Sequence, residues 1–155
     1  MKKIYTLVAC VCLSIGVTAQ TTNLGSPLGW NGKLDDKNIP VEVMPGYNQD
    51  VINAEDAIND QSKDAPWRFG YKYDVNYTPQ NSGNWTTLPN GNRVWQLAIE
   101  CEDAMTVNLL FDDYDLPNGA YLYLYDVDKT NRVGAYTSRN NRADGELGTE
   151  LVHGD

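Results

Sequence analysis

The chain has 155 residues, with 12 Lys or Arg against 21 Asp or Glu, which gives a formal net charge of −9 at pH 7. This length fits one domain of about 100 to 200 residues and leaves no room for a second, catalytic domain. Phosphate binding depends on clustered Lys and Arg, and because the sequence contains no basic patch, nucleic acid is excluded as an expected partner.

The first 19 residues have the organisation of an export signal. Two lysines precede a mostly apolar stretch at residues 4–17, and small residues then form a cleavage site before Gln20. We therefore expect a secreted or periplasmic protein cleaved after Ala19, and loss of the two lysines would change its charge from −9 to −11. No later apolar run approaches the ~18 residues that a membrane helix needs, so no membrane span is expected.

Residues 7–10 also resemble a lipobox, in which Cys10 would carry a lipid anchor. Only six residues separate Lys3 from Cys10, and the stretch after Cys10 stays apolar, so cleavage is favoured over lipidation. Cleavage would leave Cys101 as a single thiol. It lies on the apolar side of an alternating stretch, which favours burial over reactivity.

Residues 20–64 are predicted to be an extended lead-in, because Gly, Pro, Asn and Asp are frequent there and sustained apolar patterns are few. Residues 39–44 are the apolar exception. A short helix is predicted at residues 53–59, where Asn53 would cap the first turn and two acidic residues would lie near the favourable end of the helix dipole.

Residues 65–155 are predicted to form an all-β domain, an antiparallel β-sandwich of the jelly-roll kind. Short apolar stretches alternate there with turn signals at intervals of ~8 to 12 residues. The Asn90-Gly91 pair is a strong hairpin signal, since both residues tolerate positive φ. In the long strand at residues 93–102 one face is apolar, while Gln96 and Glu100 point toward solvent or a second layer. Strands are expected at residues 67–75, 85–88, 93–102, 105–111, 120–125, 133–137 and 146–152.

The turn and strand residues of this region also carry a family resemblance. The matching stretches are residues 67–70, 81–85, 91–99, 104, 111, 116–125, 134–137, 144–145 and 154–155. Their order and spacing resemble the N-terminal, propeptide-like β domain that precedes the trypsin-like catalytic domain in secreted bacterial lysyl endopeptidases and related serine proteases. The resemblance implies a module that assists the folding of a serine protease catalytic domain or covers it.

The resemblance also has a limit at the end of the sequence. Such proteins continue beyond Gly154-Asp155 with another strand and the protease domain, whereas this sequence ends there. We therefore expect a β-sandwich that is incomplete at its C-terminus, no catalytic residue, no cofactor and no enzymatic activity in the chain as given. An incomplete sandwich would leave an open sheet edge, through which self-association is expected.

The sequence contains few residues that could bind a metal or catalyse hydrolysis. The one histidine, His153, lies near the end of the sequence and would make a poor general base, and with Cys101 it cannot form a zinc site. Calcium needs only oxygen ligands, so Asp126 and Asp128 are candidate ligands, as is the acidic cluster at residues 112–115. The residues that follow lack the EF-hand glycine and glutamate, and a solvated turn is favoured, so no metal site is expected.

Aromatic side chains suggest a different function. Tyr121, Tyr123, Tyr125 and Trp85 could stack on sugar rings, as in carbohydrate-binding jelly rolls. Cross-strand pairs that stabilise a sheet are the favoured interpretation of these residues. A free-standing glycan- or protein-binding β-sandwich module nevertheless remains the alternative function.

Overall fold

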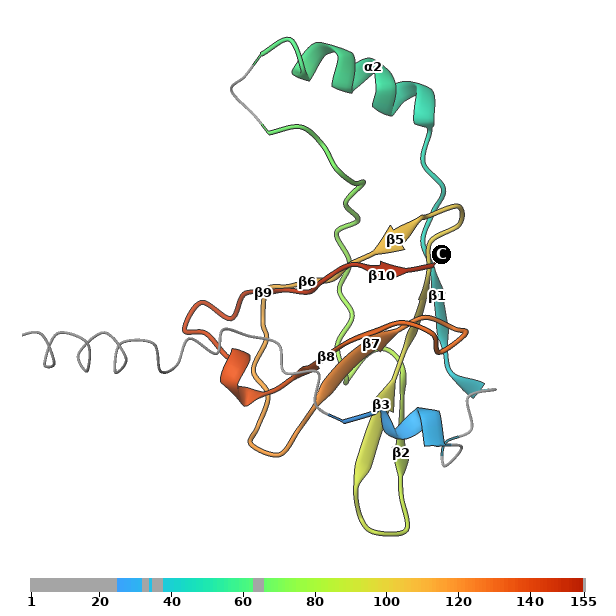
Figure 1. The fold of residues 1–155 in the computed structure, drawn as a ribbon, viewed down its shortest axis with the longest axis vertical. Helices are drawn as coiled ribbons and strands as arrows, with labels where there is room; N and C mark the ends of the chain where they lie inside the picture. Colours follow the sequence, from blue (N-terminus) through green and yellow to red (C-terminus); the bar gives the residue numbers. More distant parts are fainter. Residues whose placement is uncertain (1–24, 32–33, 35–37, 63–65, 155) are drawn as a thin grey trace, which may run out of the picture.

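The computed structural model describes residues 25–31, 34, 38–62 and 66–154. The predicted export signal, with Cys10 and the cleavage site, lies outside them. Within these residues the fold is mostly strands with a single α-helix, α2 (Gln49–Asn59), so a predominantly β fold is confirmed (Figure 1). The other elements are η1 (Leu28–Asn31), β1 (Val41–Val43), β2 (Asn84–Thr87), β3 (Arg93–Gln96), β4 (Ala98–Glu100), β5 (Thr106–Val107), β6 (Leu110–Phe111), β7 (Leu122–Tyr125), β8 (Arg132–Tyr136), η3 (Ser138–Asn140), β9 (Leu147–Gly148) and β10 (Val152–His153).

The described strands pair two by two and do not build larger sheets. Strand β1 runs parallel to β4, whereas the pairs β2–β3, β7–β8, β5–β10 and β6–β9 are antiparallel. Two further hydrogen bonds extend the parallel pair, from Ala98 N to Pro40 O at 2.9 Å and from Met44 N to Glu100 O at 2.8 Å. The apolar exception in the predicted lead-in is thus a strand that pairs with the domain.

The predicted hairpin at Asn90-Gly91 is confirmed. It joins β2 to β3, in which Trp85 lies opposite Trp95. Gly91 has a φ of 84°, and Leu88 N donates to Asn92 O at 2.8 Å, which closes the turn. Positive φ at this position is what an Asn-Gly hairpin signal indicates.

Residues 105–111 and 147–154 form one long antiparallel structure, which we call the ribbon. It contains the pairs β5–β10 and β6–β9. Thr149 continues the pairing between them, because its N donates to Leu109 O and its Oγ1 accepts from Leu109 N, both at 2.9 Å. The strands predicted at residues 105–111 and 146–152 are therefore present, each interrupted once.

The pair β7–β8 joins the ribbon through buried tyrosines. Tyr136 on β8 is 2% exposed, and its hydroxyl accepts a hydrogen bond from Glu150 N at 3.0 Å. The hydroxyl of Tyr114, also buried, donates to Thr137 O at 3.2 Å. Burial raises the pKa of Tyr114 to about 12. These hydroxyls keep hydrogen-bond partners inside the protein, as buried polar groups must.

The helix predicted at residues 53–59 is present and ends at Asn59 as expected, but it begins four residues earlier, and the predicted N-cap is wrong. Helix α2 begins at Gln49, and its N-cap is Asn48, whose side chain accepts from Asp50 N at 3.0 Å and Val51 N at 3.3 Å. Asn53 lies inside the helix, and its side chain does not cap the helix N-terminus. Both asparagines suit an N-cap, and Asn48 has the advantage that Ile52 can then be buried.

The strand predicted at residues 67–75 is also wrong. This stretch has no regular secondary structure, bends at Gly70, and forms no backbone–backbone hydrogen bond with the described part of the chain. In the long strand at residues 93–102, the pairing breaks at Leu97, and Gln96 is buried at 9% exposure. The alternation predicts the faces of a strand but not whether a neighbouring backbone exists to pair with it.

Candidate functional site

Helix α2 and the chain on either side of it project from the rest of the molecule. Figure 1 shows α2 at one end, apart from the strands. We call residues 45–62 and 66–75 the arm. Of the apolar side chains in the helix only Ile52 is buried, while Val51 and Ile58 are exposed. Helix stability in proteins comes mainly from packing of an apolar face, so the arm needs other contacts to hold its shape.

Arg68 supplies one set of these contacts. Its Nη2 lies 2.8 Å from Glu55 Oε2 and its Nε lies 3.0 Å from Asp56 Oδ1, so it links residues 66–75 of the arm to the helix. The hydrogen bond to Glu55 and the nearby negative charges raise the pKa of Arg68. A guanidinium that binds two carboxylates by different nitrogens fixes orientation as well as charge.

Tyrosines supply the second set of contacts in the arm. The rings of Tyr47 and Tyr71 stack with centroids 5.4 Å apart, and Tyr71 meets Tyr73 edge to face at 4.9 Å. The Tyr73 hydroxyl donates to Pro45 O at 2.6 Å. The two sides of the arm therefore hold each other at its base.

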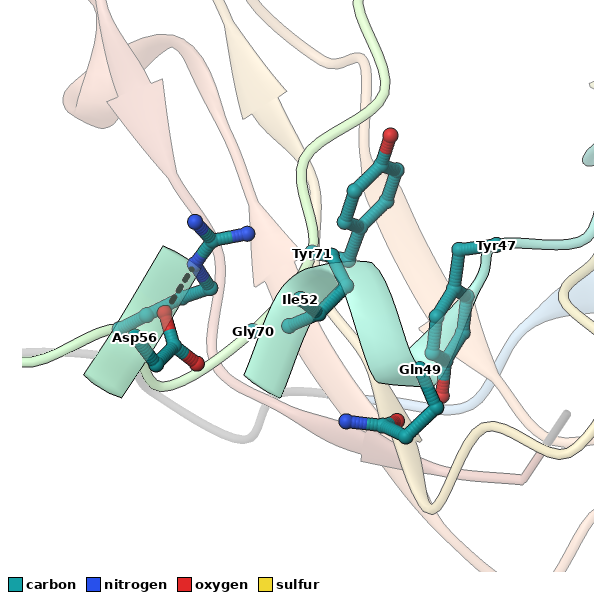
Figure 2. Close-up of a pocket in the computed structure, with 7 residues that line it drawn as sticks. Tyr47, Gln49, Ile52, Asp56, Gly70 and Tyr71 are labelled. Atoms are coloured by element: carbon teal, nitrogen blue, oxygen red, sulfur yellow. Dashed lines mark ion pairs between the residues drawn. The ribbon is translucent and has the colours of Figure 1, made fainter. Parts of the chain in front are cut away.

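The arm also contains a pocket of about 180 Å³ between helix α2 and residues 66–75 (Figure 2). It is lined by Tyr47, Gln49, Ile52, Asp56, Arg68, Gly70 and Tyr71. Ligand pockets are usually ~300 to 1,000 Å³, and here the charged groups already bind one another. The pocket is a gap between the side chains that hold the two sides of the arm together, and it offers little room for a small molecule.

The most exposed aromatic side chains of the described residues lie in the part of the arm that follows the helix, residues 66–75. Trp67 is 78% exposed and Phe69 is 89% exposed. Neither was singled out as a site residue by the sequence, because the aromatic alternation indicates a half-buried strand. The sequence holds no clear signal for their exposure, because the next predicted strand, at residues 85–88, follows at the usual spacing. Adjacent exposed aromatics are typical of surfaces that contact another protein.

The predicted aromatic binding residues lie in different sheets. Trp85, on β2, is partly exposed, its indole donates to Pro79 O at 3.0 Å, and the Arg93 guanidinium lies 4.2 Å above its ring. The tyrosines lie on or next to β7. No single aromatic platform unites Trp85 with them.

The three tyrosines also differ in exposure. Tyr121 is exposed, whereas Tyr123 and Tyr125 are partly buried. The Tyr125 ring packs edge to face against Trp30 at 5.8 Å, and burial raises the pKa of Tyr123. The segment around η1 therefore covers part of this face, which leaves Tyr121 as its open end.

The calcium candidates lie in the turn between β7 and β8. The Asp126 carboxylate accepts hydrogen bonds from the backbone and side chains of both Thr130 and Asn131. Burial alone would raise the pKa of Asp126, but these hydrogen bonds outweigh it and lower the pKa to about 2. Asp128 is exposed and takes no part in them. Asp126 thus organises its own turn with the lone pairs that a cation would need.

Among the described residues, no group of three or more His, Cys, Asp or Glu side chains is arranged to hold a metal ion. His153 is exposed on β10, opposite Thr106. Cys101 is partly buried, and desolvation raises the pKa of its thiol. A raised thiol pKa lowers the thiolate fraction and with it the reactivity.

No protein-family model matches this sequence, and no solved structure matches the fold. No helix in the described ranges has the length and apolar character that crossing a membrane requires.

Proposed function

We propose that this chain is an exported, non-catalytic N-terminal or pro-region module of a lysyl endopeptidase-like serine protease, which assists the folding of the catalytic domain or covers it. Residues 65–155 form a β-sandwich of the jelly-roll kind in this proposal. Its support is the family resemblance, together with the antiparallel pairs that share buried Tyr136 and Tyr114.

The observation that carries the proposal is the surface of the ribbon. Three large apolar side chains are exposed on it: Met105 at 87%, Leu110 at 67% and Leu151 at 53%. Residues 102–113 and 146–154 contain no Lys or Arg. Exposed carboxylates lie in or next to the same stretches of the chain, namely Glu102, Asp103, Asp112, Asp113, Glu146 and Glu150.

Exposed apolar side chains on an acidic ribbon fit a partner that offers apolar and basic surface residues. Opposite charges steer association, while apolar contacts supply most of the binding free energy. A protease catalytic domain with such a face is the partner that the resemblance implies. The glycan-binding alternative has less support, because Tyr123 and Tyr125 are partly covered.

Refolding of a bacterial lysyl endopeptidase catalytic domain tests the proposal. Added in excess, the chain is expected to raise the yield of active protease or to inhibit the folded enzyme, more strongly at low salt. The variant with Met105→Ser, Leu110→Ser and Leu151→Ser is expected to lose both effects while keeping its circular dichroism spectrum. Val127→Ser, at an exposed valine outside the ribbon, is the matched control. The proposal is wrong if the unmodified chain neither binds, inhibits nor aids refolding.

A further inference from the structure

Lys72 is an exposed cation in a part of the arm whose backbone is not engaged by the chain itself. Its side chain is 68% exposed. Residues 71–75 have no regular secondary structure and form no backbone–backbone hydrogen bond in the described part of the chain. The N–H and C=O groups on both sides of Lys72 are therefore available to pair with another protein.

The other cations in the described part of the chain lie on strands, in hydrogen-bonded turns, in a short helix or in ion pairs that fix them: Arg68, Arg93, Lys129, Arg132, Arg139 and Arg142. Lys72 has an ion pair with Asp74 at 2.7 Å, but the Asp74 side chain is 85% exposed. Such an exposed pair is easily released, since water solvates both charges. A partner can therefore bind Lys72 without unfolding a strand or a turn.

The residues on either side of Lys72 are held by the opposite side of the arm. The Tyr71 ring stacks on Tyr47 with centroids 5.4 Å apart, and the Tyr73 hydroxyl donates to Pro45 O at 2.6 Å. Both anchors lie in the short segment before helix α2. A residue that is already positioned in this way loses less conformational entropy on binding than a flexible one does.

Lys72 also lies on the side of the arm that is close to the ribbon. The hydrogen bond to Asp74 raises the pKa of Lys72, and the negative charge of Asp112, directly after β6, adds to this effect. Exposed charges act on one another over only about 10 Å at ordinary salt. One partner can therefore contact the ribbon and Lys72 together.

From these observations we infer that Lys72 is the residue through which the chain occupies the active site of the serine protease proposed above, with its ammonium group in an acidic specificity pocket. Trypsin-like serine proteases bind the side chain before the scissile bond in such a pocket, where a carboxylate pairs with a basic group. The inference rests on the proposed function and narrows it, because a chain bound in this way covers the catalytic cleft itself.

The anchors on both sides of Lys72 make the bound chain a slow substrate. Attack of the protease serine on the Lys72 carbonyl carbon breaks the bond to Tyr73 N, and the serine proton passes through the catalytic histidine to the new amine. Since Tyr71 and Tyr73 stay fixed to the same segment of the arm, this amine remains beside the acyl group. Re-formation of the peptide bond, which returns the proton to the serine, then competes with hydrolysis by water.

Inhibition of a folded bacterial lysyl endopeptidase, measured with a small chromogenic lysine substrate, tests the inference. The unmodified chain is expected to inhibit competitively, and Lys72→Ala to weaken the inhibition on the order of a hundredfold. The same variant is expected to keep the effect of the unmodified chain on refolding yield. Arg139→Ala, at an exposed cation on η3, is the matched control and should inhibit as the unmodified chain does.

A second variant tests the role of the anchors. Tyr73→Phe keeps the ring but loses the hydrogen bond to Pro45, so mass spectrometry should show faster cleavage after Lys72 than in the unmodified chain.

Equal inhibition by Lys72→Ala and the unmodified chain, or inhibition that added substrate does not relieve, overturns the inference. The proposed function then stands, because the chain binds the protease elsewhere. Rapid cleavage of the unmodified chain after Lys72 with loss of inhibition overturns the inference as well. A chain that neither binds the protease nor aids its refolding overturns both proposals.

Discussion

Two stretches of this chain carry the same aromatic alternation, residues 67–75 in the arm and residues 121–125 at β7, and only the second is paired. Tyr123 and Tyr125 lie on a strand hydrogen-bonded to β8, whereas the aromatic residues of the arm lie on an irregular backbone that forms no backbone–backbone hydrogen bond with the described part of the chain. The difference arises beyond the strand itself. Residues 121–125 are followed at once by a turn that returns the chain alongside them.

That turn is encoded by Asp126, which binds Thr130 and Asn131 and so directs β8 back along β7. The arm is also followed by a turn, at residues 78–82, in which the Asn81 side chain accepts a hydrogen bond from Thr78 N at 2.8 Å. That turn leads into β2, which pairs with β3 and not with residues 67–75. A turn after an alternating stretch therefore supplies a partner strand only when the next strand pairs back with that stretch.

The largest expected difference between the two regions is in side-chain truncation. Tyr136→Ala removes a ring that is 2% exposed and hydrogen-bonded to Glu150, so the free energy of unfolding should fall by about 3 to 5 kcal/mol. Trp67→Ala removes a larger ring that is 78% exposed and should change it by less than about 0.5 kcal/mol. Urea unfolding at low protein concentration measures both. Equal losses in the two variants would show that the arm is packed as tightly as β8.

Two glycines provide the next contrast. Gly134 on β8 has a φ of 104°, and an added Cβ would lie 2.6 Å from Leu122 O, so Gly134→Ala should cost about 2 to 3 kcal/mol. A Cβ at Gly70 meets no atom within 4 Å, and its φ lies outside the positive range. Gly70→Ala should therefore be neutral or stabilise by up to about 1 kcal/mol. Thermal unfolding of the two variants checks the contrast, and a neutral Gly134→Ala would contradict it.

How far the sequence predicts this fold follows from the same distinction. Elements with a local partner were predictable, namely the Asn90-Gly91 hairpin and the β7–β8 pair. The strands of the ribbon were also predicted as strands, although they pair with residues far away in the chain, as Phe111 does with Leu147. The parallel pairing of β1 with β4 was not, since it joins residues more than fifty positions apart and no local signal encodes it. Helix α2 was placed too late because Asn48 and Asn53 are equally good caps by residue type, and only the burial of Ile52 distinguishes them.

The candidate sites divide in a similar way. The sequence identified Asp126 by its residue type, but its hydrogen bonds to Thr130 and Asn131 depend on the folded turn. The exposure of Trp67 and Phe69 could not be foreseen, because a pattern of alternating aromatics is usual for strands that have a neighbour. The exposed Met105, Leu110 and Leu151 were hidden for the same reason, within strands expected to be covered.

The turn that pairs β7 with β8 should be sensitive to acid. The folded-state pKa of Asp126, about 2, lies below the ordinary aspartate value of 3.8, so its ionised form stabilises the fold above pH 4. That contribution is lost as the pH falls from about 4 to about 2. Asp126→Asn should cost about 1 to 2 kcal/mol at pH 7 and less near pH 2.

The measurement is the difference in unfolding free energy between the unmodified chain and Asp126→Asn at several pH values. Asp128→Asn, at the exposed aspartate of the same turn, is the matched control and should show almost no difference at any pH. If the difference at Asp126 stays constant from pH 7 to pH 2, the hydrogen bonds from Thr130 and Asn131 do not hold the ionised form.

The smallest expected effect on global stability lies in the arm. Arg68→Ala removes the ion pairs with Glu55 and Asp56, which are partly exposed, so the free energy of unfolding should fall only slightly. Hydrogen exchange should respond far more, because the helix then loses its link to residues 66–70 and α2 opens independently of the sheets. Arg142→Ala, which breaks the exposed pair with Asp144, is the control for loss of a surface ion pair. Faster exchange confined to α2 in Arg68→Ala would show that the arm is a separate unit held by side chains, whereas the pairs β7–β8 and β2–β3 are held by backbone hydrogen bonds.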